Sequence, residues 1–143
     1  MGERNVHAAE VLIAAAAAVS RELAHDVAIV CVDRGGHVLA SRRTDNTGYP
    51  AMEAARRKAA TSAVMGVPTA MVAGLVSQDP LAAAALSSSP DMLAVPGGAP
   101  LVVDAVTVGG IGIAGAHYSE DETILQAALS RVSEQTRDAG ESV

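Results

Sequence analysis

The sequence has almost no large aromatic side chains. It contains no tryptophan and no phenylalanine, and its only tyrosines are Tyr49 and Tyr118. Half of its 143 residues are nevertheless hydrophobic. The core must therefore consist of alanine, valine, leucine, isoleucine and methionine, so we expect helices and strands that pack closely and not across thick aromatic layers.

Basic charge and cysteine are also scarce. The formal net charge is −6, and the sequence has no extended basic stretch. Nucleic-acid binding needs clustered basic side chains that neutralise phosphates, so the sequence argues against a nucleic-acid partner. Cys31 is the only cysteine and lies between two valines in an apolar run. No disulfide can form within the chain, and we expect a reduced, buried thiol.

The sequence has neither a recognisable leader nor a long apolar run. The alanine-rich stretch from Ala14 to Ala18 is too short to span a bilayer and is flanked by polar residues. We therefore expect a cytoplasmic protein with no membrane partner. The length fits one domain over residues 1–143, and no repeat or linker divides it.

The order of helical and strand-like segments predicts an α+β domain. Helices are expected over residues 5–24, 51–64 and 69–76, with a short helix or turn over 78–90 and a last helix from residue 119 onward. Two hairpins are expected over residues 27–43, which turn at Gly35-Gly36, and 101–116, which turn at Asp104-Ala105. Hairpins favour an antiparallel sheet covered by helices.

The second hairpin contains a strand with one nearly bare face. Alternation along residues 106–116 places Gly110, Gly112, Ala114 and Ala116 on the same face. Glycine inside a strand is unfavourable and is tolerated where a backbone or a ligand must come close. This face is therefore either a floor on which a helix packs or the floor of a ligand pocket, and we favour the helix.

Several segments together resemble a known family. They read AIVCVDRGGHVLASRRTD, RRKAATSA, PGGAP and VGGIGIAGAHYSEDE. Over residues 6–129 the chain is similar to the GlcG/HbpS (DUF336, haem-degrading) family, which includes the C-terminal domain of PduO-type proteins. The resemblance implies a profilin-like α/β sandwich with a five-stranded antiparallel sheet flanked by helices. It also implies self-assembly from dimers up to octamers, and either haem binding or a role in small-molecule catabolism or biosynthesis.

Four polar residues that follow the glycine-rich strand are the candidate catalytic group: His117, Glu120, Asp121 and Glu122. An imidazole beside carboxylates can move a proton near neutral pH, and the start of a helix favours an anionic ligand. The alternative is that the acids only cap the last helix. Ser119 and Glu122 have the spacing of a capping box, which would make Ser119 the N-cap.

The resemblance also suggests substrate-binding residues: Arg43, Asp45, Lys58, Gly97 and Gly98. An arginine fork would suit a carboxylate ligand, but Arg43 and Asp45 could equally form a local ion pair. Gly97 and Gly98 could simply form a turn.

Histidine positions give two further expectations. His37 follows the turn of the first hairpin and is a candidate ligand contact, although it could be an ordinary exposed strand residue. No pair of histidines has the spacing of a compact metal site, so we expect no bound metal.

Three functions remain open. One is an enzyme that needs no cofactor and uses acid/base chemistry of the isomerisation, lyase or hydrolysis type on a small anionic or carbonyl-bearing metabolite. Another is a haem-binding protein that senses or degrades haem. A porphyrin commonly lies between large apolar rings, which this chain lacks, so we favour the enzyme. A pure assembly protein is a third possibility.

Overall fold

A computed structural model describes residues 2–140 as five helices and four strands. In chain order these are α1 (Gly2–Glu22), β1 (Ala28–Asp33), β2 (Val38–Arg43), α2 (Tyr49–Met65), α3 (Thr69–Val76), α4 (Pro80–Ser87), β3 (Gly98–Val103), β4 (Val106–Ala114) and α5 (Tyr118–Ala139). The predicted order of helices and hairpins is confirmed. The first helix begins three residues earlier than expected, and Glu3 in its first turn complements the helix dipole.

The sheet of the described residues has four antiparallel strands in the order β2-β1-β4-β3. The expectation of five strands is therefore wrong. The chain between α2 and β3 is rich in alanine and leucine and forms the short helices α3 and α4, which Pro68 and Asp79 precede as N-caps. Alanine and leucine favour a helix over an additional strand.

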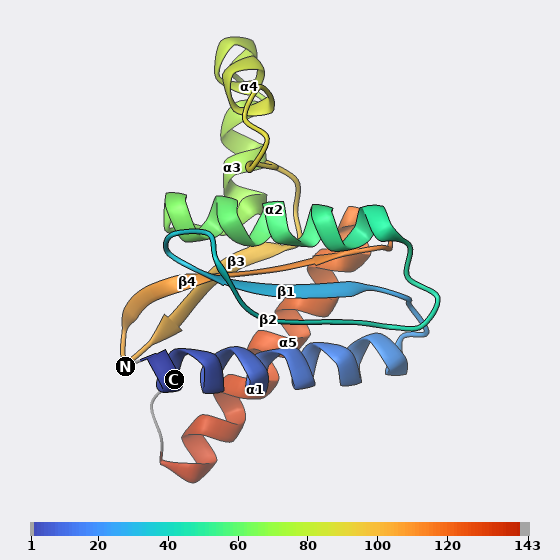
Figure 1. Ribbon diagram of the computed structural model, residues 1–143, viewed down its shortest axis with the longest axis vertical. Coiled ribbons are helices and arrows are strands. Elements are labelled where there is room, and N and C mark those ends of the chain that lie inside the picture. Colours follow the sequence, from blue (N-terminus) through green and yellow to red (C-terminus); the bar gives the residue numbers. More distant parts are fainter. Residues whose placement is uncertain (1, 141–143) are drawn as a thin grey trace.

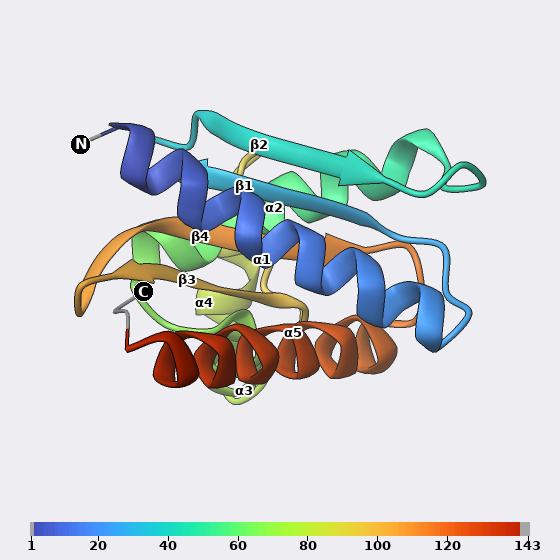
Figure 2. The same ribbon diagram turned by 90° about the horizontal axis from the view of Figure 1, so that it is seen from below.

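The four strands lie between two helical layers (Figures 1 and 2). On one face α2 packs against Ala28, Val30 and Val32 of β1. On the other face α1 and α5 enclose the alternate residues of β1, including Ile29 and Cys31. The Cys31 thiol is buried as predicted, and burial raises its pKa to about 12.

The bare face of β4 is the floor beneath α2. A Cβ atom added at Gly110 would lie 2.1 Å from the carbonyl oxygen of Ala59, and one at Gly112 would lie 2.0 Å from that of Ala55. These glycines therefore let the helix backbone contact the strand backbone. The interpretation of this face as a helix-docking surface is confirmed.

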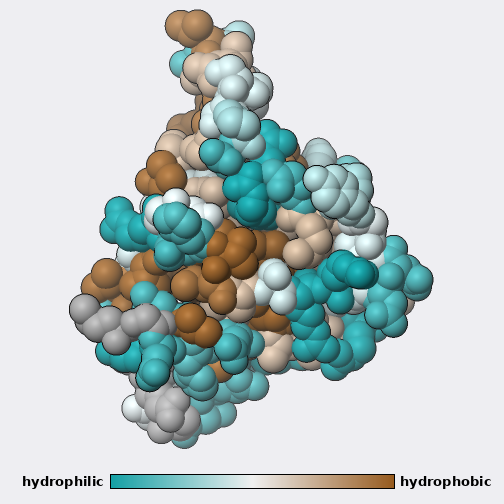
Figure 3. Space-filling model, viewed as in Figure 1, coloured by the Kyte–Doolittle hydropathy of each residue, from teal (hydrophilic) through white to brown (hydrophobic). Residues whose placement is uncertain are grey.

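Helices α3 and α4 project from the sandwich as a hairpin (Figure 1). Met71, Leu75 and Leu81 on this hairpin are 54%, 65% and 80% exposed, and Figure 3 shows hydrophobic residues at its tip.

Within residues 2–140 no single helix is long and apolar enough to cross a membrane. α2 and α3 reach that length and apolar character only when they are taken together, and they are bent by 82° relative to each other.

Candidate functional site

A cleft of about 620 Å³ lies at the edge of the sheet where β4 ends. Ala54 and Lys58 from α2 line one side, Ala114 from β4 lies at the base, and His117 and Asp121 come from the start of α5. Three of the residues predicted for the site therefore lie together here: His117, Asp121 and Lys58. The short β4–α5 connection explains why the strand end and the helix start share one cleft.

Lys58 and Asp121 form a buried ion pair. The Lys58 Nζ atom lies 3.0 Å from Asp121 Oδ2 and donates a second hydrogen bond, of 2.8 Å, to the carbonyl oxygen of Ile113. The other Asp121 oxygen accepts from the backbone N–H of Ala116 at 3.1 Å. The two residues are 3% and 2% exposed. Together they connect α2, β4 and α5 at the wall of the cleft.

Burial shifts the pKa of each partner in the direction that favours its uncharged form. It lowers the pKa of the Lys58 ammonium, and the negative charge of Asp121 offsets part of this effect. Burial also raises the pKa of the Asp121 carboxyl, and the Lys58 charge opposes that rise. Transfer of the proton from Lys58 to Asp121, which leaves both groups uncharged, therefore costs less here than in water.

Gly97 and Gly98 lie behind the ion pair and do not line the cleft. Gly97 has a φ of +122°, and a Cβ atom there would lie 2.8 Å from Lys58 Nζ. Gly98 is packed against α2, and its N–H donates to Thr69 Oγ1 at 2.8 Å. The two glycines give the chain room beside Lys58.

His117, and not Ser119, is the N-cap of α5. The His117 Nδ1 atom accepts from the backbone N–H of Ser119 at 3.2 Å and lies 2.7 Å from the Ser119 hydroxyl. An Nδ1 that accepts this bond carries no proton, so the neutral ring has its N–H at Nε2. The ring is exposed and lies 4.1 Å, between centroids, from the ring of Tyr118. His117 therefore presents an Nε2–H donor at the cleft.

The predicted capping box is absent, because Glu122 has other partners. Its Oε1 accepts from the Gly97 N–H at 3.0 Å, and its Oε2 accepts from Gln126 at 2.8 Å. Glu120 lies on the surface, 3.5 Å from Nε2 of His25. Within residues 2–140 none of the three acid side chains is hydrogen-bonded to the His117 ring. Asp121 is the one of the three that lines the cleft with His117.

Arg43 and Asp45 line a different hollow, of about 390 Å³, between the end of α1 and the end of β2. The Arg43 guanidinium donates to the carbonyl oxygens of Thr44 and Asp45 at 3.3 and 3.4 Å. The alternative of an ion pair between Arg43 and the Asp45 carboxylate is not found among the described residues.

His37 lies at the far end of the sheet from the cleft. Its Nδ1 atom is 3.4 Å from Asp33 Oδ1, and its side chain is 84% exposed. Ala28 pairs with Ala114 at the cleft end of the sheet, whereas Asp33 pairs with Gly109 at the other end. The fold therefore does not bring His37 together with His117.

The loop between β2 and α2 supplies cleft residues that the sequence analysis missed. Asn46, Thr47 and Gly48 all line the cleft. The Thr47 hydroxyl donates to the carbonyl oxygen of Val27 at 3.1 Å and contacts Thr44 Oγ1 at 2.7 Å. The polar composition of this loop was visible in the sequence, but its position opposite α5 depends on the strand order.

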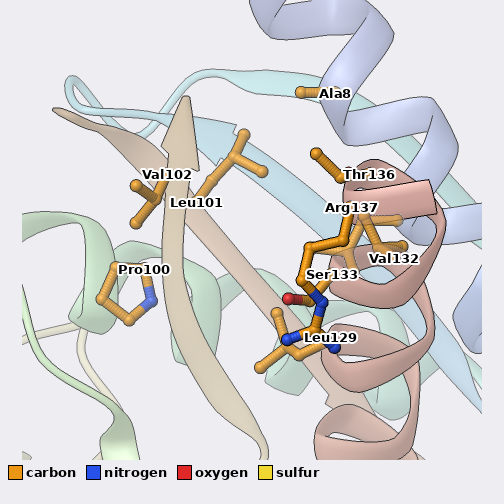
Figure 4. Close-up of a pocket in the computed structure, with 10 residues that line it drawn as sticks. Ala8, Pro100, Leu101, Val102, Leu129, Val132, Ser133, Thr136 and Arg137 are labelled. Atoms are coloured by element: carbon orange, nitrogen blue, oxygen red, sulfur yellow. The ribbon is translucent and has the colours of Figure 1, made fainter. Parts of the chain in front are cut away.

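A second cavity, of about 380 Å³, lies between α1, β3 and α5 (Figure 4). Its lining includes Leu101, Val132 and Arg137, and it contains no residue predicted for the site. Among the described residues no group of three histidine, cysteine, aspartate or glutamate side chains is placed to hold a metal ion. The cleft with Lys58 and His117 is therefore the candidate site.

Solved structures resemble the chain over most of its length. A double mutant of HbpS from Streptomyces reticuli is 31% identical, with a TM-score of 0.77 over 87% of this chain and 84% of that one. PduOC in complex with haem is 25% identical, with a TM-score of 0.76 over 87% and 91%. The Klebsiella pneumoniae protein ORFY, at 24% identity and a TM-score of 0.77 over 87% of each chain, shares the fold.

The sequence itself matches a family over most of its length. No curated protein is similar enough to the chain to match it. A family model described as haem-degrading protein HbpS-like matches residues 5–130. With the identity to HbpS over most of both chains, this match confirms the resemblance found in the sequence. The chain belongs to the HbpS-like family.

Proposed function

We propose that the chain binds a small anionic or carbonyl-bearing metabolite in the cleft between α2 and α5 and catalyses proton transfer on it without a cofactor. The observation that carries the proposal is the buried Lys58–Asp121 pair beside His117 in one cleft of about 620 Å³. A paired acid and base with shifted pKa values in a cleft is typical of a functional site.

The side chains take different roles in this proposal. His117 accepts and returns a proton at Nε2 in the tautomer that carries its N–H at Nδ1, where the Nδ1–H donates to the Ser119 hydroxyl in place of the capping bond. Asp121 is the second proton acceptor. The N-terminal end of α5 favours a negatively charged group on the ligand, since the partial positive charge of the helix lies there.

Proton exchange on a simple oxo acid tests this proposal. We expect the wild type to accelerate replacement of the methyl protons of pyruvate by deuterium in heavy water, as measured by proton NMR. His117→Ala should slow this exchange about 100-fold, because it removes a general acid–base group. His37→Ala is the matched control and should leave the rate unchanged. Failure of the wild type to bind or exchange any small oxo acid would contradict the proposal.

Haem binding is the second candidate, and two observations favour it. One similar structure, PduOC, is a haem complex, and one wall of the cleft is aliphatic, formed by Pro50, Ala51, Ala54, Leu93 and Val95. His117 is the cleft residue that would bind the iron, and the bound group would supply redox chemistry that these side chains lack. A histidine that binds iron through Nε2 usually donates its Nδ1–H. His117 could do so only toward the Ser119 hydroxyl.

A hemin titration separates the two candidates. Haem binding predicts a saturable Soret shift at one equivalent per subunit that His117→Ala abolishes and His37→Ala retains. The metabolite proposal predicts only weak, non-saturating changes with hemin. A saturable shift that survives His117→Ala would mean that haem binds the protein elsewhere.

A further inference from the structure

Lys58 is the only lysine in the chain. The other nine basic side chains are arginines. An arginine is always charged and serves well in ion pairs, whereas a lysine amine can lose its proton when buried and then act as a nucleophile. The one lysine is also the basic residue that lies buried in the cleft. Lys58 is therefore a residue that can act as a nucleophile, and its burial favours the uncharged amine that does so.

The surroundings of Lys58 Nζ leave one bonding position open. An ammonium has three N–H groups, and two of them are taken by Ile113 and Asp121. Transfer of the proton between Nζ and Asp121 leaves a neutral amine with two N–H groups and a lone pair, and rotation about the Cε–Nζ bond can turn this lone pair from Asp121 toward the cleft. Gly97 leaves room for Nζ itself, since a Cβ atom there would lie 2.8 Å from it. Lys58 itself lines the cleft.

Asp121 is placed to take the proton from Lys58. Its Oδ2 atom lies 3.0 Å from Nζ, and the Ala116 N–H holds its other oxygen in place. Burial disfavours both charges and so lowers the cost of the neutral pair, amine and carboxylic acid. The neutral amine is the form that can attack a carbonyl carbon.

We infer that Lys58 forms an imine with a small aldehyde or 2-oxo acid bound in the cleft. The inference rests on the proposed function, because it takes the carbonyl-bearing metabolite as the ligand. The Lys58 ammonium first gives a proton to Asp121. The Nζ lone pair then forms a bond to the carbonyl carbon, and the carbonyl electron pair moves to the oxygen. Nitrogen loses a proton as oxygen gains one, which gives a neutral carbinolamine.

Loss of water completes the step. Asp121 donates its proton to the carbinolamine hydroxyl, the C–O bond breaks and water leaves. The nitrogen lone pair forms the second C–N bond, so Lys58 becomes a protonated imine. One amine and one carbonyl thus give one imine and one water, with no oxidation or reduction. The positive imine nitrogen faces the Asp121 carboxylate, which preserves the buried ion pair.

Reductive trapping tests the inference on the intact protein. The wild type is incubated with glyoxylate and then with sodium cyanoborohydride, and the modified residue is located by peptide mass mapping. Apart from reaction at the N-terminal α-amine, which the peptide map separates, we expect one N-carboxymethyl group per chain, on Lys58. Arg34→Lys provides the matched control, because it adds an exposed lysine in the β1–β2 turn of the same molecule. At neutral pH the adduct on Lys58 should exceed that on the introduced lysine about tenfold, since an exposed lysine is almost fully protonated.

The outcomes distinguish this inference from the proposed function. Saturable glyoxylate binding without an adduct on Lys58 would overturn the imine and leave the proposed function standing. Equal labelling of Lys58 and the introduced lysine would also overturn it. If glyoxylate neither binds nor forms an adduct on Lys58, the result would contradict both the imine and the proposed function. Lys58→Met should abolish the adduct, and if that variant does not fold, the mapping of the wild type still decides.

Discussion

At the scale of single residues, Asp33 shows how one carboxylate stabilises a turn. It ends β1, and its Oδ1 atom accepts from the backbone N–H groups of Gly35 at 2.9 Å and His37 at 3.0 Å. The hydrogen bond from the His37 backbone is the main cause that holds the pKa of Asp33 below its ordinary value, and the Gly35 bond adds to it. The charged form therefore stabilises the β1–β2 turn.

Asp33→Ala should lower the free energy of unfolding by about 1 kcal/mol at neutral pH, because two backbone donors lose their acceptor. A carboxyl with a lowered pKa in the folded state contributes its stability above the ordinary value of about 3.9. It loses that contribution as the pH falls through the folded value. Urea unfolding at about pH 7 and about pH 3 should therefore show a smaller difference between wild type and variant at the lower pH.

The exposed Asp45 gives a matched control for this prediction. Its carboxylate has no hydrogen bond or ion pair among the described residues, so Asp45→Ala should change the free energy of unfolding by less than about 0.5 kcal/mol. An equal loss for the two variants, or a difference that does not change with pH, would contradict the role given to Asp33.

The site residues show what a sequence can and cannot reveal at this scale. The cluster of His117, Glu120, Asp121 and Glu122 was visible as a group of acids and an imidazole. Consecutive helix residues point in directions about 100° apart, so each acid meets a different neighbour. Those neighbours come from the α1–β1 loop, α2 and the loop before β3. Which of the three acids lies in the cleft depends on how distant segments pack, so the sequence did not single out Asp121.

At the scale of elements, the contact between α2 and β4 depends on glycine. The helix lies so close that Gly112 has no room for a side chain, with Ala55 and Ala59 directly above it. Matching small residues appear on both partners, alanine on the helix and glycine on the strand. The sandwich therefore contains a backbone-to-backbone contact where most proteins would use larger side chains.

Gly112→Ala should cost about 3 kcal/mol of unfolding free energy, since the added Cβ would lie 2.0 Å from the Ala55 carbonyl oxygen and would push α2 away. Gly74→Ala in α3 is the matched control, because nothing lies within 4 Å of the added atom. It should stabilise the protein by about 0.5–1 kcal/mol through its better helix propensity. Thermal and urea unfolding would measure both changes. Similar effects of the two substitutions would contradict the close packing of α2 on β4.

The elements themselves were largely predictable, and the exceptions have physical reasons. The first hairpin followed from its glycine turn, both hairpins followed from β-branched runs, and the bare face of β4 followed from alternation. The fifth strand came from the family resemblance and not from the residues, which favour helices between α2 and β3. The cap of α5 was misplaced by two residues, because a histidine acts as an N-cap through its ring nitrogen.

At the scale of the whole molecule, the α3–α4 hairpin is the feature that a single chain does not explain. Residues 59–78 contain no charged side chain, and Asp79 is the only one between there and residue 90. α4 buries none of its residues, and Leu75 and Leu81 are 65% and 80% exposed. An exposed apolar surface of this kind commonly marks a site of association. We therefore predict that the expected self-assembly, from dimers up to octamers, uses the surface of α3 and α4.

We expect the protein to sediment as a homo-oligomer in analytical ultracentrifugation. The double substitution Leu75→Glu and Leu81→Glu should shift it to the monomer, because burying two carboxylates in an apolar contact costs more than the contact gains. Val106→Glu is the matched control, since Val106 is 57% exposed at the start of β4, away from the hairpin. It should leave the sedimentation unchanged. A monomeric wild type, or an equal effect of the substitutions at both places, would contradict self-assembly through α3 and α4.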